Sequence, residues 1–297
     1  MNNMYSIAEW NIDRKTTADD SLILRINEIM ENNDILFLTE VCGKAKTTLE
    51  NRWLKSLSTE LYIYNIRRIG KTEYMIAVVS KDKFDTIAFL DDNDELPVDS
   101  RISTIGISTV LKDNRKEFVI KGVRLQTICT GREFKNQTGM FVSDVIDSKP
   151  DIIIGDFNWS TTIGKYINKI LGSGERKKEN IEHSKKILRK ILGDKELVIP
   201  KEYSGEDKLC TLINHVIDDD TVEYGIWPHT DSGIFSAKTR NHNTYILSNP
   251  DRVMWNTKAV SGIKKTYSPL LFDGNTDFFN DWPSDHSILK FMFSISG

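Results

Sequence analysis

Hydrophobic positions along the chain form short runs that predict strands interleaved with helices. Ile-Leu-Phe-Leu within Asp34–Thr39 is continuously apolar, as in a strand buried on both faces. Ser21–Met30 places apolar residues at helical spacing and predicts a helix. The apolar runs Ile102–Leu111 and Phe118–Leu125 flank a polar turn and predict a hairpin. Further strands are predicted over Met4–Trp10, Tyr62–Ile66, Tyr74–Ser80, Phe84–Leu90, Asp151–Ile154, Asp251–Asn256 and Ser287–Phe293, and further helices over Thr47–Leu61, Phe134–Ile146 and Glu175–Leu192.

The order of these elements predicts an α/β fold in which helices cover two packed sheets. The chain has 297 residues, which is near the upper size for one hydrophobic core. It contains no repeat, low-complexity tract or evident linker. We therefore expect a single domain over residues 1–297, with a basic helical insertion at about residues 160–195.

Composition narrows the class of protein. Hydrophobic residues make up 39% and charged residues 28% of the chain, as in a folded globular protein. The formal charge of −3 excludes a globally cationic nucleic-acid binder, so phosphate binding would depend on local basic groups or a metal. The N-terminus lacks a signal-peptide pattern, and no apolar run approaches the roughly 20 residues of a membrane span. Three cysteines without metal-type spacing suit a reducing compartment, so we expect a cytoplasmic protein. We also expect a monomer that binds no membrane.

Polar residues mark the ends of predicted strands in five places along the chain. The most informative is Gly155-Asp156-Phe157-Asn158, directly behind an apolar run of three isoleucines. The others are Asn11 with Asp13, Glu40, Asp251, and Asp285 with His286. If the strand ends meet at one edge of the packed sheets, these side chains converge. Their types bind divalent metals or phosphate, which predicts a metal-assisted site that cleaves phosphoesters.

Each of these residues has a chemical interpretation and a structural alternative. Glu40 ends a buried strand and is the best candidate for a metal ligand. Asn11 and Asp13 lie on one side of their strand and can add a phosphate or metal contact, although such a pair alone is more often a turn. Asp156 can orient or deprotonate an attacking water, and Asn158 can donate to the charge that develops on phosphate.

His286 is the candidate imidazole of the site. It can contact the scissile phosphate as an imidazolium or pass a proton, and a carboxylate beside it would orient the ring and raise its pKa. Asp251 is the proposed partner. A histidine in a loop is usually solvated, so this prediction depends on the place of His286 in the ordered series.

The series resembles the endonuclease/exonuclease/phosphatase superfamily, which has a deoxyribonuclease-like fold. The resemblance spans nearly the whole chain. The matching segments are Ala8–Asn11, Asp34–Glu40, Ile154–Asn158, Asp251–Val253 and Trp282–His286.

The resemblance implies a four-layer αββα sandwich of two mixed, mainly antiparallel sheets, with a Mg2+ or Mn2+ site at one edge. It implies that Glu40 is the principal metal ligand and that Asn11, Asp13 and Asp285 lie close to the metal. By the same resemblance, Asp156 and Asn158 handle the nucleophile and the transition state. Asp251 and His286 form the His–carboxylate pair.

Arg124 departs from the family pattern. Most members carry a His or Tyr in the strand that precedes the Gly-Asp-Phe-Asn motif, whereas this chain reads Gly-Val-Arg-Leu-Gln there. A guanidinium cannot act as a general acid near neutral pH, but it can hold a phosphate through two hydrogen bonds. We predict that Arg124 is an electrostatic stabiliser; the structural alternative is an arginine paired with a carboxylate.

The sequence predicts a divalent-metal-dependent phosphodiesterase, most simply a nuclease that attacks DNA or RNA with an activated water. The basic stretch Arg176–Lys190 could contact a nucleic-acid backbone, or it could be a solvated helix face. The segment Asp251–Met254 is closer to inositol polyphosphate 5-phosphatases. Two alternatives therefore remain open: a phosphatase of a small or lipid-linked phosphate ester such as an inositol phosphate, and a non-catalytic nucleic-acid-binding relative.

Overall fold

The computed structural model describes most of the elements predicted from the sequence. The described residues are 4–12, 20–42, 46–47, 59–68, 71–80, 84–90, 102–111, 117–125, 131–158, 208–227, 237–241, 244–248, 251–267 and 286–295.

The first sheet has six strands in the order β13-β14-β1-β2-β4-β3. These strands are β1 (Tyr5–Asn11), β2 (Ile35–Cys42), β3 (Thr59–Arg68), β4 (Lys71–Ser80), β13 (Val260–Tyr267) and β14 (Leu289–Ile295). The central strands β1 and β2 run parallel and are joined through helix α1 (Asp20–Glu31), whereas the other neighbouring pairs are antiparallel. The sheet is therefore mixed and mainly antiparallel.

The second sheet repeats this arrangement, in the order β5-β6-β7-β8-β12-β9. Its strands are β5 (Phe84–Leu90), β6 (Ile102–Leu111), β7 (Glu117–Leu125), β8 (Ile152–Asp156), β12 (Asp251–Asn256) and β9 (Tyr224–Trp227). Here β7 and β8 are the parallel pair, and helix α3 (Gly131–Ser148) joins them. Strands β10 (Ala237–Asn241) and β11 (Thr244–Ser248) form a separate hairpin.

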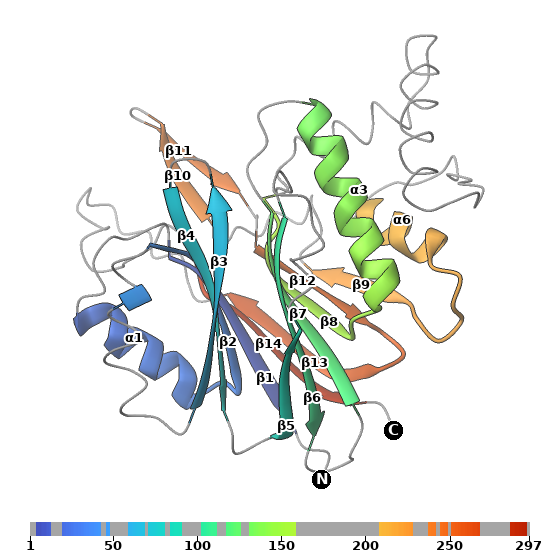
Figure 1. Ribbon diagram of the computed structural model, residues 1–297, viewed down its shortest axis with the longest axis horizontal. Helices are drawn as coiled ribbons and strands as arrows, with labels where there is room; N and C mark the ends of the chain where they lie inside the picture. Colours follow the sequence, from blue (N-terminus) through green and yellow to red (C-terminus); the bar gives the residue numbers. More distant parts are fainter. Residues whose placement is uncertain are drawn as a thin grey trace.

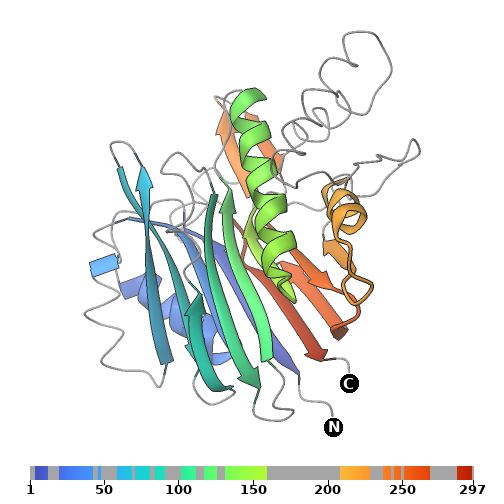
Figure 2. The ribbon, with the colours of Figure 1, turned by 45° about the vertical axis from the view of Figure 1, so that its right-hand side comes forward.

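The helices lie on the outer faces of the two sheets. Figure 1 shows α1 against the first sheet, and α3 with α6 (Lys208–Val216) on the far side of the second. The turned view in Figure 2 keeps the two sheets face to face between these helices. This arrangement confirms the predicted αββα sandwich.

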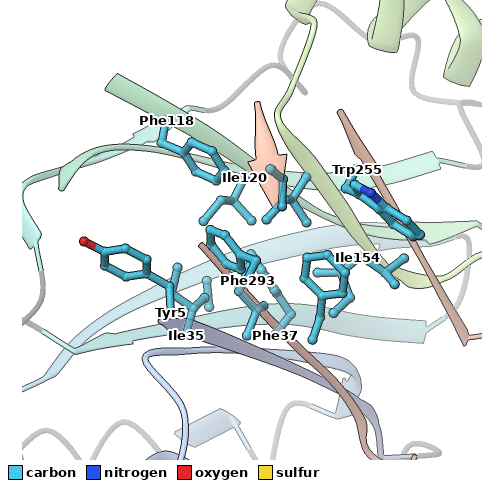
Figure 3. Packing of buried hydrophobic residues seen from close by; sticks show 14 of the residues in the cluster. Tyr5, Ile35, Phe37, Phe118, Ile120, Ile154, Trp255 and Phe293 are labelled. Carbon is cyan, nitrogen blue, oxygen red and sulfur yellow. The ribbon is translucent and has the colours of Figure 1, made fainter. Parts of the chain in front are cut away.

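Three buried hydrophobic clusters fill the three spaces between these layers. The central cluster lies between the sheets, a second lies under α3 and α6, and a third lies under α1. Strand β1 shows how alternation separates them, because Tyr5 and Ile7 face the central cluster whereas Ala8 and Trp10 face α1. Facing residues of the central cluster, drawn in Figure 3, include Tyr5, Phe37 and Phe293 from the first sheet and Phe118, Ile120 and Ile154 from the second.

Gly122 lets the two sheets approach closely at the centre of this core. A Cβ atom at this position would lie 2.2 Å from Cδ1 of Phe37, which comes from the facing sheet. The missing side chain makes room for the Phe37 ring.

Two of the predicted helices are not confirmed over the bounds expected for them. The prediction over Thr47–Leu61 is wrong at its end, because Thr59, Glu60 and Leu61 begin strand β3 and pair with β4. Antiparallel pairing with the next strand overrides local helix propensity there. The basic helix over Glu175–Leu192, and with it the insertion at about residues 160–195, lies outside the described residues. No helix within the described ranges is long and apolar enough to cross a membrane.

Candidate active site

The site begins where the inward-facing positions of the strands change from apolar to polar. In β8 these positions are Ile152, Ile154 and then Asp156; in β1, Glu9 and Asn11 follow Tyr5 and Ile7. The change occurs in both sheets at the same edge of the sandwich, so the polar groups continue the central core. Because side chains alternate along each strand, the inward-facing polar side chains of the two sheets point toward each other.

Asp156 is at the centre of this polar layer. Its neighbours across the sheet are Arg124 in β7 and Asp251 in β12. Its Oδ2 accepts hydrogen bonds from Nδ2 of Asn11 at 2.9 Å and from Nδ2 of Asn158 at 2.8 Å, and its Oδ1 accepts one from the backbone N–H of Asn158 at 2.8 Å. The carboxylate is completely buried and fixed by donors from both sheets.

The turn after β8 has the backbone conformation that these contacts need. Gly155 has φ 155°, and a Cβ atom there would lie 1.9 Å from the carbonyl oxygen of Val123. Asn158 is left-handed, with φ 47°, a conformation that asparagine tolerates better than most residues. Its amide group donates to Leu125 O at 2.6 Å as well as to Asp156. Both amide hydrogens of Asn158 are therefore engaged. Asn158 could donate to a phosphate only if one of these two hydrogen bonds broke.

A β-bulge turns Glu40 toward the site. Leu36 and Leu38 of β2 face α1, and simple alternation would send Glu40 the same way. The register between β2 and β4 shifts between Leu38 and Val41, and Glu40 has φ 55°. After the bulge it is Val41 that faces α1. The extra residue leaves Glu40 free to reach across to the second sheet.

Glu40 forms an ion pair with Arg124 of β7. Arg124 is almost fully buried, at 1% exposure of its side chain, whereas Glu40 keeps 13%. A guanidinium in this position must stay paired, because a buried charge without a partner is costly. The pair ties the two sheets together at the site.

His286 is held by Asp251. Nδ1 of the ring lies 3.0 and 2.9 Å from the two carboxylate oxygens of Asp251, which is fully buried. The Trp10 indole N–H donates to the backbone carbonyl of His286 at 3.3 Å, so β1 fixes the histidine's main chain. The contact with Asp251 therefore fixes the orientation of the imidazole ring.

Glu9 is a residue of the site to which the sequence analysis gave no role. It is completely buried, and its Oε1 accepts a hydrogen bond from Thr39 Oγ1 at 3.2 Å, whereas its Oε2 is buried without a hydrogen-bond partner among the described residues. The signal was its place two residues before Asn11, on the same inward face of β1. Within a strand of apolar residues, a charged residue at an inward position points to a buried polar site.

Burial and mutual repulsion raise the pKa values of carboxyl groups in the site. Loss of solvation raises the pKa of Asp156 to about 7, with Asp251 and Glu40 adding to the rise and His286 and Arg124 opposing it. Loss of solvation also raises the pKa of Glu9 well above its usual value, and the charges of Asp251 and Asp156 act in the same direction. A carboxyl group that titrates near neutral pH is suited to accept a proton from water.

The structure therefore brings seven of the nine predicted site residues to one edge. These are Asn11, Glu40, Arg124, Asp156, Asn158, Asp251 and His286. Asp13 and Asp285 lie outside the described residues.

The donor groups at this edge fit a hard divalent cation. Glu40 offers a partly exposed carboxylate, and Asn11 an amide oxygen, since its Nδ2 is directed at Asp156. The buried carboxylates Glu9, Asp156 and Asp251 add negative charge that a cation would offset. Within the described ranges, no three His, Cys, Asp or Glu side chains are grouped to hold a metal by themselves. Mg2+ takes one or two protein carboxylates and several waters.

Solved structures of known proteins share this fold along nearly the whole chain. ANGEL2, a 2',3'-cyclic phosphatase in complex with adenosine-2',3'-vanadate, is 16% identical, with a TM-score of 0.59, and the match covers 99% of this chain and 96% of that one. The human nocturnin catalytic domain with bound sulfate is 16% identical, with a TM-score of 0.54 and coverage of 100% and 97%. TDP2 of D. rerio, complexed with single strand DNA product, is 12% identical, with a TM-score of 0.53 and coverage of 99% and 100%.

The comparison with protein families places the chain more firmly than these distant structures. No curated protein sequence matches it significantly. The model of the Endonuclease/Exonuclease/phosphatase family matches residues 8–286, a span that begins beside Glu9 and ends at His286. The chain therefore belongs to the Endonuclease/Exonuclease/phosphatase family, whose members are hydrolases that act on phosphoesters and depend in general on a divalent metal.

Proposed function

We propose that this chain is a Mg2+- or Mn2+-dependent phosphodiesterase that hydrolyses DNA or RNA. One observation carries the proposal: Asp156, with a pKa near 7, lies between the Glu40–Arg124 pair and the His286–Asp251 pair. A base, an imidazole and a metal-binding carboxylate on one buried layer are the groups that hydrolysis of a phosphodiester requires.

The residues divide the reaction between them. Asp156 accepts the proton of the attacking water while the water oxygen forms a bond to phosphorus. His286, oriented by Asp251, faces the phosphate and supplies positive charge or a proton as the ester oxygen leaves. Glu40 and Asn11 would hold the divalent ion, which neutralises phosphate charge when bound. Arg124, in the same layer, adds a permanent positive charge to the site.

Nucleic acid is the substrate class that we favour. His286 is placed to contact a phosphate, the part of a nucleic acid to which most protein hydrogen bonds go. Among the similar structures, that of TDP2 from D. rerio contains single strand DNA product. We take the enzyme to act as a cytoplasmic monomer.

A phosphatase of a small ester is the second candidate. The Asp251–Met254 segment favours it through its similarity to inositol polyphosphate 5-phosphatases. ANGEL2 also shows that the same fold occurs in a phosphatase.

A substrate screen separates these functions. Plasmid DNA, single-stranded DNA, RNA, nucleotides and inositol phosphates would each be incubated with the protein and Mg2+ or Mn2+, and with the His286→Ala variant as a matched control. We expect strand cleavage that needs the metal and disappears in the variant. Release of phosphate from inositol phosphates alone would favour the phosphatase. Metal-independent binding of nucleic acid without any hydrolysis would contradict catalysis.

A further inference from the structure

The Glu40 carboxylate, which the proposed function assigns to the metal, is paired with the guanidinium of Arg124. The guanidinium comes from β7 in the second sheet and the carboxylate from the bulge of β2 in the first. The contact lies in a part of the site with little solvent, since Arg124 is 1% exposed. A guanidinium stays charged at any pH at which the protein folds.

Two cations cannot share this carboxylate without cost. A divalent ion on Glu40 would lie within a few ångström of the guanidinium, and like charges at that distance repel strongly where water is scarce. In this chain the positive charge is permanent.

Asp156 offers the guanidinium a second partner. Arg124 and Asp156 are opposite each other on the parallel strands β7 and β8, and both face inward. Neighbouring strands lie about 4.8 Å apart, so a long side chain on one reaches a carboxylate on the next. The charge of Arg124 already acts on Asp156, whose pKa it lowers.

We propose that Arg124 competes with the divalent metal for Glu40. The guanidinium holds Glu40 in the metal-free protein and moves to Asp156 when a divalent ion binds. This inference rests on the proposed function, and it adds that the protein binds metal more weakly than its carboxylates alone would allow. Arg124 is then a residue that tunes metal affinity.

Calorimetric titration with Mn2+ tests the competition directly. The Arg124→Gln variant keeps a polar side chain but loses the charge, and we expect it to bind Mn2+ roughly tenfold more tightly than the unchanged protein. Arg124→Lys keeps the charge and should bind with an affinity near that of the unchanged protein. The control is Arg25→Gln, which removes an arginine paired with Glu28 on the exposed side of α1 and should change nothing. Equal or weaker binding by Arg124→Gln would overturn the proposal.

A crystal structure of the unchanged protein with Mn2+ gives a second test that does not depend on the folding of a variant. We expect the metal on Glu40 and the guanidinium within hydrogen-bond distance of Asp156. An intact Arg124–Glu40 pair beside the bound ion would overturn the competition while leaving the proposed function in place. If the unchanged protein neither binds Mn2+ nor hydrolyses any phosphodiester, the proposed function fails and the competition fails with it.

Discussion

At the scale of single residues, Asp156 connects more of the site than any other described side chain. It accepts hydrogen bonds from Asn11 in the first sheet and from Asn158 in the turn after β8, and it adjoins Arg124 and Asp251. Three N–H donors suit its ionised form, whereas burial and nearby carboxylates favour its protonated form. These opposing effects place its pKa near 7, where a general base works best.

Replacing Asp156 with Asn should lower kcat about a thousandfold, because the variant has no group to accept the proton of water. KM should change much less, since the His286 and Glu40 side chains that are proposed to contact phosphate and metal remain. Steady-state rates on the best nucleic-acid substrate of the screen would measure this. The exposed Asp220→Asn is the control, and it should behave like the unchanged protein. A variant at Asp156 with nearly full activity would refute its role as the base.

The same residue should make stability depend on pH in the metal-free protein. Its pKa is raised from 3.8 to about 7 on folding, so the folded state binds more protons between these values. The free energy of unfolding contributed by Asp156 should therefore be highest at about pH 4 and fall as the pH rises to about 7. The groups that set this shift are Asp251, Glu40, His286 and Arg124.

Chemical denaturation at pH 5 and pH 7.5 checks the sign. Glu9 also has a raised pKa and acts in the same direction, so the informative quantity is the difference between the unchanged protein and Asp156→Asn. We expect the variant to lose less stability over this interval. Identical pH dependence in both proteins would show that Asp156 does not titrate there.

Sequence could identify most of the site because its residues mark strand ends. Asp156, Asp251 and His286 were found from their position after or before apolar runs, and the structure brings them together. Glu9 was missed because it lies inside a strand, where position relative to an end gives no signal. Both amide hydrogens of Asn158 are engaged by Asp156 and Leu125, which depends on three-dimensional contacts that a sequence motif does not encode.

At the scale of elements, two backbone irregularities direct side chains into the site. The bulge in β2 turns Glu40 inward, and the turn at Gly155 brings Asn158 back onto Asp156. Both positions have φ values that most residues avoid, and such strain concentrates at functional sites. The elements are thus shaped by the needs of the polar layer as well as by packing.

Gly155→Ala should destabilise the protein by about 3 kcal/mol or more, because the added Cβ atom would lie 1.9 Å from the Val123 carbonyl oxygen and the backbone itself would have to move. Gly225→Ala is the matched control. Its Cβ atom would meet the Trp255 ring at 2.9 Å, so a side chain rather than the backbone must shift, and the loss should be smaller. Denaturant unfolding of both variants would show the order, and a reversed order would argue against a special turn at Gly155.

Element boundaries were predictable where local pattern and pairing agree. Strands β5, β6 and β12 have the bounds expected from their apolar runs. Thr59–Leu61 was assigned to a helix because the local residues permit one, but pairing with β4 made it part of β3. Helix α6 and the hairpin β10–β11 were not predicted, since their short apolar patterns do not distinguish helix from strand.

At the scale of the whole molecule, the fold makes the site by holding two sheets face to face. Apolar residues join the sheets through most of the interface, and polar pairs join them at one edge. The αββα arrangement was predictable because helices and strands alternate in both halves of the chain. The order of strands within each sheet was beyond the sequence, because it depends on contacts between segments far apart in the chain.

Phe293→Ala should lower the free energy of unfolding by about 3–5 kcal/mol. The ring contacts Tyr5 in its own sheet and Phe118 in the facing sheet, with centroid distances of 5.7 and 5.4 Å, so its loss leaves a cavity between the sheets. Leu24→Ala is the control, because Leu24 is 61% exposed and should contribute less than about 0.5 kcal/mol. Equal effects of the two substitutions on the free energy of unfolding would mean that the central core does not stabilise the fold.

The central claim is that the polar residues of the two sheets form one metal-assisted phosphodiesterase site. The most direct test measures hydrolysis of a phosphodiester substrate against Mg2+ concentration for the unchanged protein and for Glu40→Gln, with folding checked by circular dichroism. We expect the unchanged protein to be activated by Mg2+ in a saturable manner, and the folded variant to lose most activity and its response to the metal. A folded Glu40→Gln variant with full, Mg2+-dependent activity would contradict the claim.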